Sequence, residues 1–450
     1  MSARRFDLVI IGTGVAASTV AERCRNAGWS VAVIDELPPG GTCALRGCDP
    51  KKILVGSAEA VAGVRRLEGK GIRPGGVGID WPELMGFKRA MIGGQQERKE
   101  ESRRRAGIEL FRGHARFAAP STLLTETDRI EAKFILVASG AKPAPLGIPG
   151  EEHLTTSTEF LELDALPRRI AFVGGGFISF EFAHVAIRAG AEVTILHRGV
   201  HPLPLFDPDL AELLAAKSRT LGIDVRLQTV VTGIERHDGG LLVSARHGSE
   251  ELRVEADLVV HGAGRVPAVD ELDLPAGAVE AVGRRIVLND FLQSVSNPAV
   301  YAAGDAAATG PALTPVAGHE GAIVARNLLE GNCARPDYGV VPSVVFTVPP
   351  LASVGLSEQA AREAGAAFRG ELIDTSSWYS SRRVGETHSA AKVLVEEGTD
   401  RILGAHLLGP AAAETINLFA MAMRLGATAT DVRTMLYAYP THASDVPHML

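Results

Sequence analysis

Two cysteines, Cys43 and Cys48, are the residues whose type and spacing offer the clearest chemistry in this chain. They lie five positions apart in a glycine-rich run, Gly40-Gly41-Thr42-Cys43-Ala44-Leu45-Arg46-Gly47-Cys48. Two thiols at this spacing can close a small loop as a disulfide and can then exchange an electron pair with a donor or a substrate. The alternative is a chance pair of buried, inert cysteines. Because a nucleotide-binding pattern comes before the pair, we favour a redox-active disulfide.

The N-terminal segment has the pattern of a dinucleotide-binding strand, turn and helix. Residues 6–11 form an apolar run that predicts a buried parallel strand, and residues 30–34 predict a second one. The turn between them allows close approach of a diphosphate to a helix N-terminus. Asp35 ends the second strand, where an acid is expected to accept hydrogen bonds from a ribose. The small residues of the turn and helix start are Gly12, Gly14 and Ala17.

The same pattern recurs later in the chain, which indicates a second nucleotide. Residues 169–173 predict a strand, residues 180–189 a helix and residues 191–196 the next strand. His197 and Arg198 follow that strand in place of an acid, and an arginine can bind the 2′-phosphate of NADPH with a charged fork. We therefore expect NADPH as the electron donor, with NADH as the other possible donor. The alternative for Arg198 is that it is an ordinary solvated loop residue without a role in binding. The turn residues are Gly174, Gly176 and Ser179, and Ser179 replaces the third glycine or alanine.

These motifs resemble those of the class I pyridine nucleotide-disulfide oxidoreductases, the flavoprotein family of glutathione reductase, dihydrolipoamide dehydrogenase and mercuric reductase. The cysteine run continues into Pro50-Lys51-Lys52, which leans toward glutathione reductase. Residues 297–305 resemble the family's late FAD motif and end in Gly304-Asp305, ahead of a further match at residues 313–317. Altered forms of two intermediate signatures occupy residues 138–143 and 262–267. The resemblance covers almost the whole chain.

The resemblance implies an α/β fold with two Rossmann-type dinucleotide-binding domains, for FAD and NADPH, and a C-terminal α+β dimerisation domain. The expected segments are 1–150 and 265–337 for the FAD-binding part, 151–264 for the NAD(P)H-binding domain and 338–450 for the interface domain. A homodimer whose active sites are shared between subunits is also implied, and it would bury the apolar helix expected at about residues 413–425. The residues expected to bind the cofactors are Gly12, Gly14, Ala17, Asp35, Gly41, Thr42, Gly140, Gly174, Gly176, Arg198, Gly264, Gly304, Asp305 and Ala317.

The resemblance further implies the catalytic roles. NADPH reduces FAD and the electron pair passes to the Cys43–Cys48 disulfide, so that Cys48 is the thiolate beside the flavin and Cys43 the thiol that attacks the substrate. A helix N-terminus and a nearby cation are expected to lower the pKa of these thiols. Lys52 is matched to the family's lysine near the reactive flavin nitrogen, and Glu181 to the carboxylate partner of that lysine.

The C-terminal segment departs from the family's pattern. Most relatives carry a His-Pro-Thr segment followed by a glutamate, which shuttle protons at the interchange thiol, whereas this chain has Tyr439 and Ser444 at those places. A tyrosine with an ordinary pKa of about 10 does not act as a base at neutral pH as imidazole does. We interpret Tyr439 as a residue that shapes the pocket or orients an acceptor, and we expect no compensation from His442 or Asp445.

Composition limits the remaining choices. The 450 residues are 46% hydrophobic, enough for several domains, and a net charge of −7 without a basic stripe argues against a nucleic-acid partner. The chain has only four cysteines, which favours a reducing compartment. Its cysteines and histidines do not have the spacing of a metal site, so we expect no metal. Without a bilayer-length apolar run or a signal peptide, we expect a cytoplasmic protein with no membrane partner. The charged run at residues 97–105 is expected to be a solvated helix face.

Three functions remain open from the sequence. The leading one is an NADPH-dependent reductase that uses the cysteine pair on a disulfide or another thiol-reactive small molecule. The second is a reductase of metal ions or quinones, in which the cysteines matter less. The third is a redox-sensing flavoprotein with little turnover.

Overall fold

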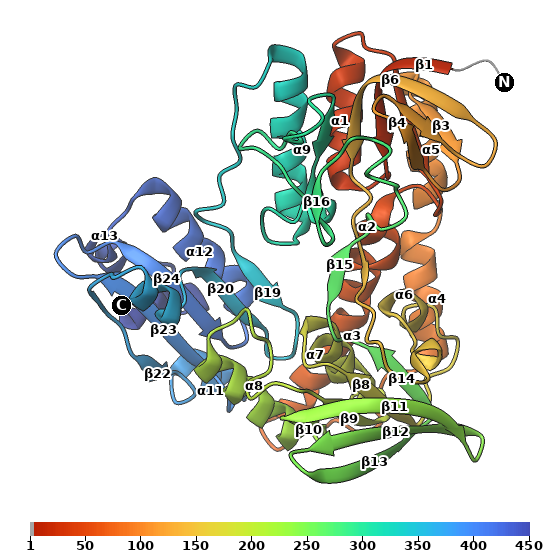
Figure 1. Ribbon diagram of the computed structural model, residues 1–450. Coiled ribbons are helices and arrows are strands. Elements are labelled where there is room, and N and C mark those ends of the chain that lie inside the picture. The colour runs from red at the N-terminus through yellow and green to blue at the C-terminus, as the bar shows by residue number, and fades with distance from the viewer. Residues whose placement is uncertain (1–3) are drawn as a thin grey trace. The chain divides into compact units, whose positions relative to one another are not determined.

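The computed structural model describes residues 4–450, which form two compact units assembled from segments distant in the sequence (Figure 1). The first unit contains Met1–Pro50, Arg89–Ala144 and Arg265–Tyr338. The second contains Lys51–Lys88, Pro145–Gly264 and Gly339–Leu450. Two helices run across the boundary between the units, α3 (Cys48–Arg66) and α4 (Trp81–Ile92).

A parallel sheet forms the centre of the first unit. Its strands are β1 (Arg4–Ile11), β2 (Val31–Asp35), β3 (Glu109–Arg112) and β6 (Arg129–Val137). They lie in the order β3-β2-β1-β6, and Leu8 to Ile11 of β1 pair with β2 on one side and β6 on the other. Strands covered on both faces read as continuous apolar runs, which is why this segment lacks the alternation of a half-exposed strand.

Helices and shorter strands complete the first unit. The helices are α1 (Val15–Asn26), α2 (Gly41–Arg46), α5 (Gln95–Ala106), η2 (Gly304–Ala306) and α9 (Thr314–Glu330). The further strands are β4 (Arg116–Ala119), β5 (Thr122–Leu124), β7 (Ala141–Pro143), β15 (Arg265–Pro267), β16 (Ala281–Val282), β17 (Arg285–Ile286) and β18 (Val300–Ala302). Helices α1 and α9 lie side by side (Figure 1), and a Cβ on Gly321 would be 2.9 Å from the Ala16 carbonyl oxygen. This close approach therefore requires a glycine in α9.

A second parallel sheet carries the repeated nucleotide motif in the second unit. Its strands are β8 (Arg169–Val173), β9 (Glu192–Leu196), β10 (Asp224–Arg226) and β14 (Leu258–His261), in the order β10-β9-β8-β14. The helices beside it are η1 (Glu151–His153), α6 (Ser157–Phe160), α7 (Phe177–Ala186) and α8 (Pro208–Thr220). An antiparallel meander follows, made of β11 (Thr229–His237), β12 (Gly240–His247) and β13 (Glu250–Ala256).

The C-terminal part of the second unit is an antiparallel sheet with helices. Its strands are β19 (Ser343–Val345), β20 (Leu351–Gly355), β21 (Phe368–Arg369), β22 (Leu372–Asp374), β23 (Ala390–Glu396) and β24 (Ile402–Leu408). The helices are α10 (Glu358–Glu363), α11 (Tyr379–Arg383), α12 (Ala412–Leu425), α13 (Ala429–Thr434) and η3 (His442–Met449). Together with the two parallel sheets, this α+β arrangement confirms the predicted fold class.

The division into units differs from the expected segments in two respects. The segments expected as the NAD(P)H-binding domain and the interface domain belong to one unit. Residues 51–88 join the second unit and not the FAD-binding part. The physical reason is packing, because Leu54 of α3 and Met85 of α4 are fully buried in the same apolar cluster as Phe160 and Phe172. The other expected boundaries, at residues 150, 264 and 337, lie close to the observed ends at Ala144, Gly264 and Tyr338.

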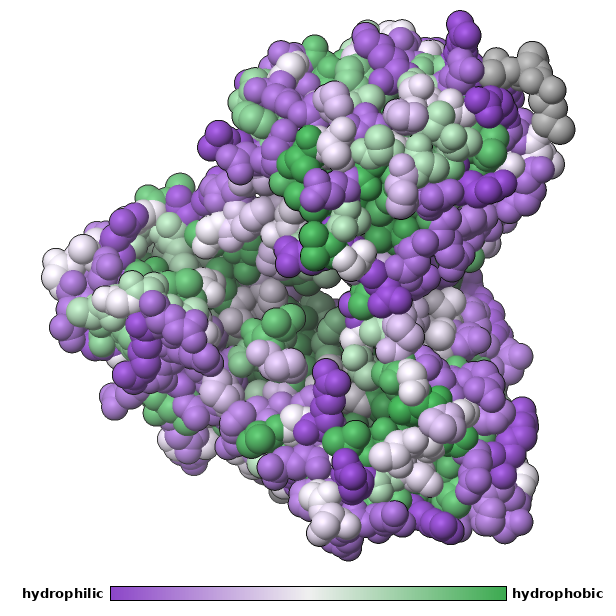
Figure 2. Space-filling model, viewed as in Figure 1, coloured by the Kyte–Doolittle hydropathy of each residue, from purple (hydrophilic) through white to green (hydrophobic). Residues whose placement is uncertain are grey.

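Several large apolar side chains of the C-terminal segment are exposed. Figure 2 shows hydrophilic residues over most of the face in view, with hydrophobic residues interspersed. Ile416 and Phe419 of α12 are buried against the antiparallel sheet, whereas Met421 and Leu425 are exposed, and Leu436 and Tyr439 after α13 are exposed as well. None of the helices in the described residues combines the length and apolarity needed to cross a membrane.

Candidate active site

The cysteine pair lies on two consecutive helices that follow the first nucleotide motif, the short α2 and the long α3. Cys43 is in α2, Gly47 follows this helix, and Cys48 begins α3. Gly41 has φ +76, and a Cβ there would be 2.5 Å from Cα of Gly14. Only glycine permits both this backbone conformation and this contact, so the thiol-bearing helix begins directly against the dinucleotide turn.

The two thiols interact with each other and with Thr314 at the start of α9. Both cysteines are in the dithiol form, and Cys48 Sγ lies 3.5 Å from the Thr314 hydroxyl. A hydrogen bond with Cys48, together with burial, raises the pKa of the Cys43 thiol, while Thr314 opposes this shift. We expected a lowered pKa for this thiol, and the difference arises because the neighbouring thiol and Asp49 favour the neutral form.

The first nucleotide turn is packed tightly on one side and open on the other. Gly12 has φ +104, and a Cβ there would collide with the Ala138 carbonyl, whereas a Cβ on Gly14 or on Gly140 would meet nothing within 4 Å. Asp35 lies at the end of β2, where it accepts hydrogen bonds from the Thr13 hydroxyl at 2.5 Å and from the Leu37 amide at 3.0 Å.

The late motif places a second carboxylate in the first unit. Asp305 lies in η2, and burial raises its pKa while Arg265 opposes the shift. Gly304, which has φ +70, donates its N–H to the buried Glu320 carboxylate at 2.6 Å. A Cβ on Gly304 would be 3.4 Å from Cβ of Ala317, so the expected residue Ala317 lies beside this turn.

These features fit a bound flavin dinucleotide. Two buried polar atoms of the first unit, Arg103 Nη1 and Ser139 Oγ, have no hydrogen-bond partner within residues 4–450. Asp35 and Asp305 offer carboxylates to sugar and ribityl hydroxyls, and the turn offers a helix N-terminus to a diphosphate. The arrangement of these residues is compatible with bound FAD.

The second nucleotide turn has the same close packing as the first. Gly174 has φ +101, and a Cβ there would collide with the backbone of Gly262 and Ala263. A Cβ on Gly176 would be 3.0 Å from the Gly262 carbonyl oxygen. Ser179 is fully buried in α7 against Gly262, so a serine at this position still lets the helix pack closely.

The end of β9 carries a neutral ring and an exposed cation. His197 Nδ1 accepts the Gly175 N–H at 3.0 Å, and Nε2 donates to the His201 carbonyl at 2.9 Å. Burial lowers the pKa of His197, and Arg198 lowers it further. Arg198 itself is exposed. The strand end therefore presents no carboxylate at either position.

Glu181 pairs with Lys51, and this corrects the expected pairing with Lys52. Glu181 is buried in α7 and accepts hydrogen bonds from Lys51 Nζ at 2.9 Å and from the Phe346 amide at 2.7 Å. Lys52 instead bonds the exposed Glu59 at 3.0 Å. Both ammonium groups lie over the Phe346 ring, at 4.3 and 4.5 Å from its centroid, but only that of Lys51 is bonded to the Glu181 carboxylate among the described residues. The spacing from Cys48 in the sequence was not enough to tell which of the two lysines pairs with Glu181.

Basic residues of α5 also depart from the expected solvated face. Lys99 Nζ donates to the Gly40 carbonyl at 3.0 Å, next to the cysteine-bearing helix. Arg103 is buried and donates through Nη2 to the Thr13 carbonyl and the Ser18 hydroxyl, both at 3.0 Å. A helix that is polar on all sides gives no hydropathy signal for the face that turns inward, so the sequence pattern could not identify these two residues.

The C-terminal segment separates Tyr439 from the neighbouring titratable groups. Tyr439 is 82% exposed. His442 and Asp445 instead line a small cavity of about 30 Å³ with residues of β23, β24 and α12, and burial lowers the pKa of His442. Ser444 caps its own turn through hydrogen bonds with Thr441. Within one subunit these groups do not form a histidine–carboxylate dyad with Tyr439.

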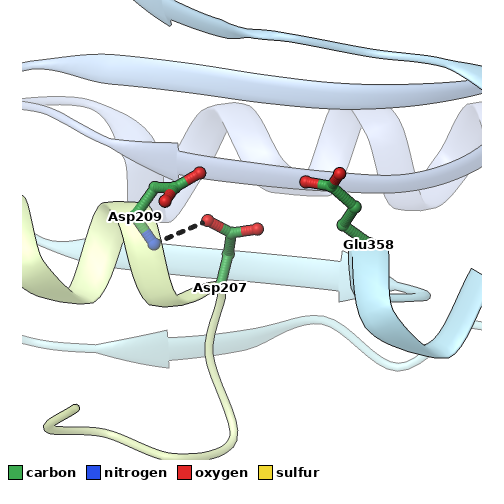
Figure 3. A group of neighbouring side chains, drawn as sticks. All are labelled: Asp207, Asp209 and Glu358. Atoms are coloured by element: carbon green, nitrogen blue, oxygen red, sulfur yellow. Dashed lines mark hydrogen bonds between the residues drawn. The ribbon is translucent and has the colours of Figure 1, made fainter. Parts of the chain in front are cut away.

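A carboxylate cluster in the second unit is occupied by a lysine. Asp207 and Asp209 lie at the start of α8 and Glu358 at the start of α10 (Figure 3). Lys392 Nζ lies 2.9, 2.5 and 3.1 Å from oxygens of these three acids. The ammonium group fills the place that a cation would take, so we interpret the cluster as a structural ion-pair network.

Comparison with known proteins identifies the family. The pyridine nucleotide-disulphide oxidoreductase model matches residues 6–321, and the dimerisation domain of the same family matches residues 341–450. The chain is 34% identical over 447 residues to a glutathione reductase of Burkholderia cepacia, covering 98% of this chain and 97% of that protein. It is 31% identical to a mercuric reductase of Staphylococcus aureus, covering 97% of this chain and 80% of that protein.

A solved structure gives the same result. The chain resembles the Cu(II) complex of the HOCl-induced flavoprotein disulfide reductase RclA from Escherichia coli, with a TM-score of 0.88, 28% sequence identity and coverage of 100% and 99% of the two chains. The expected family, fold and enzyme class are thereby confirmed. The chain belongs to the pyridine nucleotide-disulphide oxidoreductase family and is an FAD-dependent disulfide oxidoreductase that uses a pyridine nucleotide.

Proposed function

We propose that this enzyme uses NADPH to reduce a small disulfide at Cys43 and Cys48. The observation that supports this proposal best is the position of α2, which carries Cys43 and begins against Gly14 of the first dinucleotide turn. The cysteines interact with each other there, as a pair that alternates between dithiol and disulfide must. FAD, when bound, would accept hydride from the nucleotide and supply the electron pair that reduces this disulfide.

The chain's own residues carry the exchange with substrate. The Cys43 thiolate attacks one sulfur of the substrate disulfide, which breaks the S–S bond, releases one thiolate and leaves Cys43 in a mixed disulfide. The Cys48 thiolate then attacks Cys43 Sγ, releases the second thiolate and restores the Cys43–Cys48 disulfide. Two electrons leave the cysteine pair and two product thiols form. In most relatives a histidine at the place of Tyr439 protonates the released thiolates, and this chain lacks that histidine.

Lys51 takes over the role first assigned to Lys52. In the family, the lysine near the flavin is the one that pairs with a carboxylate, and here Glu181 pairs with Lys51. We therefore propose that Lys51, oriented by the buried Glu181, favours negative charge on the cofactor. Lys52 remains a surface residue in this proposal.

The nucleotide preference is inferred from the end of β9. An acid there would accept hydrogen bonds from the ribose of NADH and repel a 2′-phosphate, but this chain has the neutral His197 and the exposed Arg198. Arg198→Ala should lower kcat/KM with NADPH about tenfold or more, since a charge-assisted contact contributes roughly 1.5–3 kcal/mol. The kcat/KM with NADH should change little. Equal use of both nucleotides that survives this substitution would contradict the preference.

A homodimer would complete the site. Met421, Leu425, Leu436 and Tyr439 are exposed apolar side chains of the dimerisation domain, and a second copy of the chain is the partner that the family implies. In this proposal Tyr439 lines the substrate pocket of the neighbouring subunit.

The proposed relay has a direct spectroscopic test. Anaerobic addition of about two electrons per subunit should give a long-wavelength thiolate-to-flavin absorption band, and Cys48→Ser should abolish it. Cys333→Ser is the matched control, because Cys333 is an exposed thiol outside the pair, and this variant should keep the band. Plain flavin bleaching in the native enzyme, with both thiols alkylated before reduction, would show that no disulfide relay exists.

Reduction of Cu(II) is a second candidate. This candidate is supported by the similarity to a reductase whose structure was solved with Cu(II). It is also supported by Tyr439, because disulfide reduction is served by a base at this position and a tyrosine is a poor base at neutral pH. NADPH-dependent formation of Cu(I), followed with a chromogenic chelator, should then persist in Cys43→Ser. Loss of Cu(II) reduction together with disulfide reduction in that variant would leave only the first proposal.

A further inference from the structure

One arginine of α5 turns inward while its neighbours stay in solvent. Helix α5 has the sequence QQERKEESRRRA, and Arg103 is its one buried residue, with 7% of its surface exposed. The side chains of Arg104 and Arg105 are 76% and 77% exposed and pair with Glu101 on the same helix. Burial of a guanidinium is costly unless its donors are satisfied, so the inward position of Arg103 requires a physical reason.

The inward guanidinium is only partly satisfied by the protein. Nη2 donates to the Thr13 carbonyl and the Ser18 hydroxyl, while Nη1 is buried and has no hydrogen-bond partner in the part of the chain that the structure describes. A buried donor without a partner is destabilising, and more so when the group is charged. Packing alone would be served at lower cost by an apolar side chain of similar length.

The atoms around this guanidinium belong to the first nucleotide turn. Thr13 lies between Gly12 and Gly14, and Ser18 lies in the first turn of α1, whose N-cap residue is Gly14. The backbone N–H groups of such a turn and the helix dipole attract a diphosphate. Asp35, at the end of β2, lies beside this turn, but its oxygens accept hydrogen bonds from Thr13 and Leu37, and Arg103 donates none to it among the described residues.

We propose that Arg103 binds the diphosphate of FAD through its unpartnered Nη1. A guanidinium is planar and presents several donors at once, which allows it to hold the turn with one nitrogen and a phosphate oxygen with the other. The negative charges of a diphosphate would add to the attraction that Asp35, Glu22 and Glu100 already exert on the buried cation. The helix that appeared to be a solvated surface element thereby supplies a cofactor-binding residue.

The test compares Arg103→Met with Arg104→Met, a matched control on the same helix whose side chain is exposed. The readout is the dissociation constant of FAD for the full-length chain stripped of flavin, followed by quenching of flavin fluorescence. Arg103→Met should weaken FAD binding at least tenfold and make it less dependent on salt, because one charge contact to phosphate is lost. Arg104→Met should stay within twofold of the native chain.

A second readout separates phosphate binding from a structural role. ADP competes for the same turn and should lose affinity in Arg103→Met by a factor similar to that for FAD, whereas adenosine, which has no phosphate, should bind as it does to the native chain. Without FAD, the unfolding midpoint of Arg103→Met should equal or exceed that of the native chain, since a buried donor without a partner is removed. A lowered midpoint with unchanged FAD affinity would show that Arg103 only supports the packing of α5 and would overturn the proposal.

Arg103→Lys keeps the proposal testable if the methionine variant does not fold. A lysine retains the charge but has a single nitrogen, which cannot reproduce the fork between Thr13, Ser18 and a phosphate. We expect a loss of FAD affinity of threefold or more, partly restored at low salt. Native affinity in Arg103→Lys at all salt concentrations would overturn the proposal.

Discussion

The pairing of Glu181 with Lys51 predicts a large difference between two adjacent lysines. In Lys51→Met, the Glu181 carboxylate stays buried and keeps only the Phe346 amide as a hydrogen-bond donor. In Lys52→Met, the exposed Glu59 loses a partner but stays in water. The two substitutions remove the same atoms from consecutive positions of α3, so they form a matched pair.

The expected magnitudes follow from the two environments. The Lys51 and Glu181 side chains are 13% and 3% exposed, and at 2.9 Å an effective dielectric constant of about 20 gives a gross attraction of about 6 kcal/mol. Much of this attraction is offset by desolvation, but removal of one partner leaves an uncompensated charge and costs about 3–5 kcal/mol. The Lys52 and Glu59 side chains are about half exposed, and such pairs contribute about 0–1 kcal/mol.

The assay is equilibrium unfolding in urea, followed by circular dichroism and by tryptophan fluorescence so that the two probes test for a single transition. The double variant Lys51→Met with Glu181→Gln should recover part of the loss, because it removes both charges. Equal stability losses in Lys51→Met and Lys52→Met, or no recovery in the double variant, would refute the assignment of the buried ion pair.

Four further results are expected. The pKa of Cys43 is raised, so alkylation of Cys43 at pH 7 should be slow and should become faster as pH rises. Because position 439 lacks a histidine, Tyr439→His with Ser444→Glu should speed turnover of glutathione disulfide at pH 7 by about 10²-fold or more, without changing flavin reduction by NADPH. An unchanged rate would mean that another group supplies the proton. Lys392→Met should lower the free energy of unfolding by about 3–5 kcal/mol, measured in urea, since it leaves Asp207 buried without its cation. Burial would raise the pKa of Glu386, but Lys217 and Arg66 outweigh it and hold this pKa below its ordinary value. The contribution of ionised Glu386 to folding stability is therefore complete above about pH 4.3 and is lost as pH falls through the lower folded-state pKa. Glu386→Gln should flatten this acid part of a stability-versus-pH curve, and an unchanged acid part would contradict the prediction.

Several features of the site could be predicted because they depend on neighbours in the sequence. Gly12 and Gly14 follow a buried strand directly, and Asp35 ends the next strand, so the turn, helix and acid of the first nucleotide motif are local consequences of strand and helix periods. The same holds for Gly174 and Gly176. The family, the fold class and the enzyme class followed from these motifs and the cysteine run, and the comparisons confirm them.

The sequence by itself thus determined which residue types meet at each nucleotide turn and that a cysteine pair follows the first one. Only the tertiary structure decided that Lys51 and not Lys52 pairs with Glu181, because Glu181 is 130 positions away from Lys51 in the sequence. It also decided that Arg103 turns inward toward Thr13, and that Glu320 supports Gly304, since neither contact has a local hydropathy signal. Contacts between distant segments depend on how strands and helices pack, and a pattern read along one segment does not contain that packing.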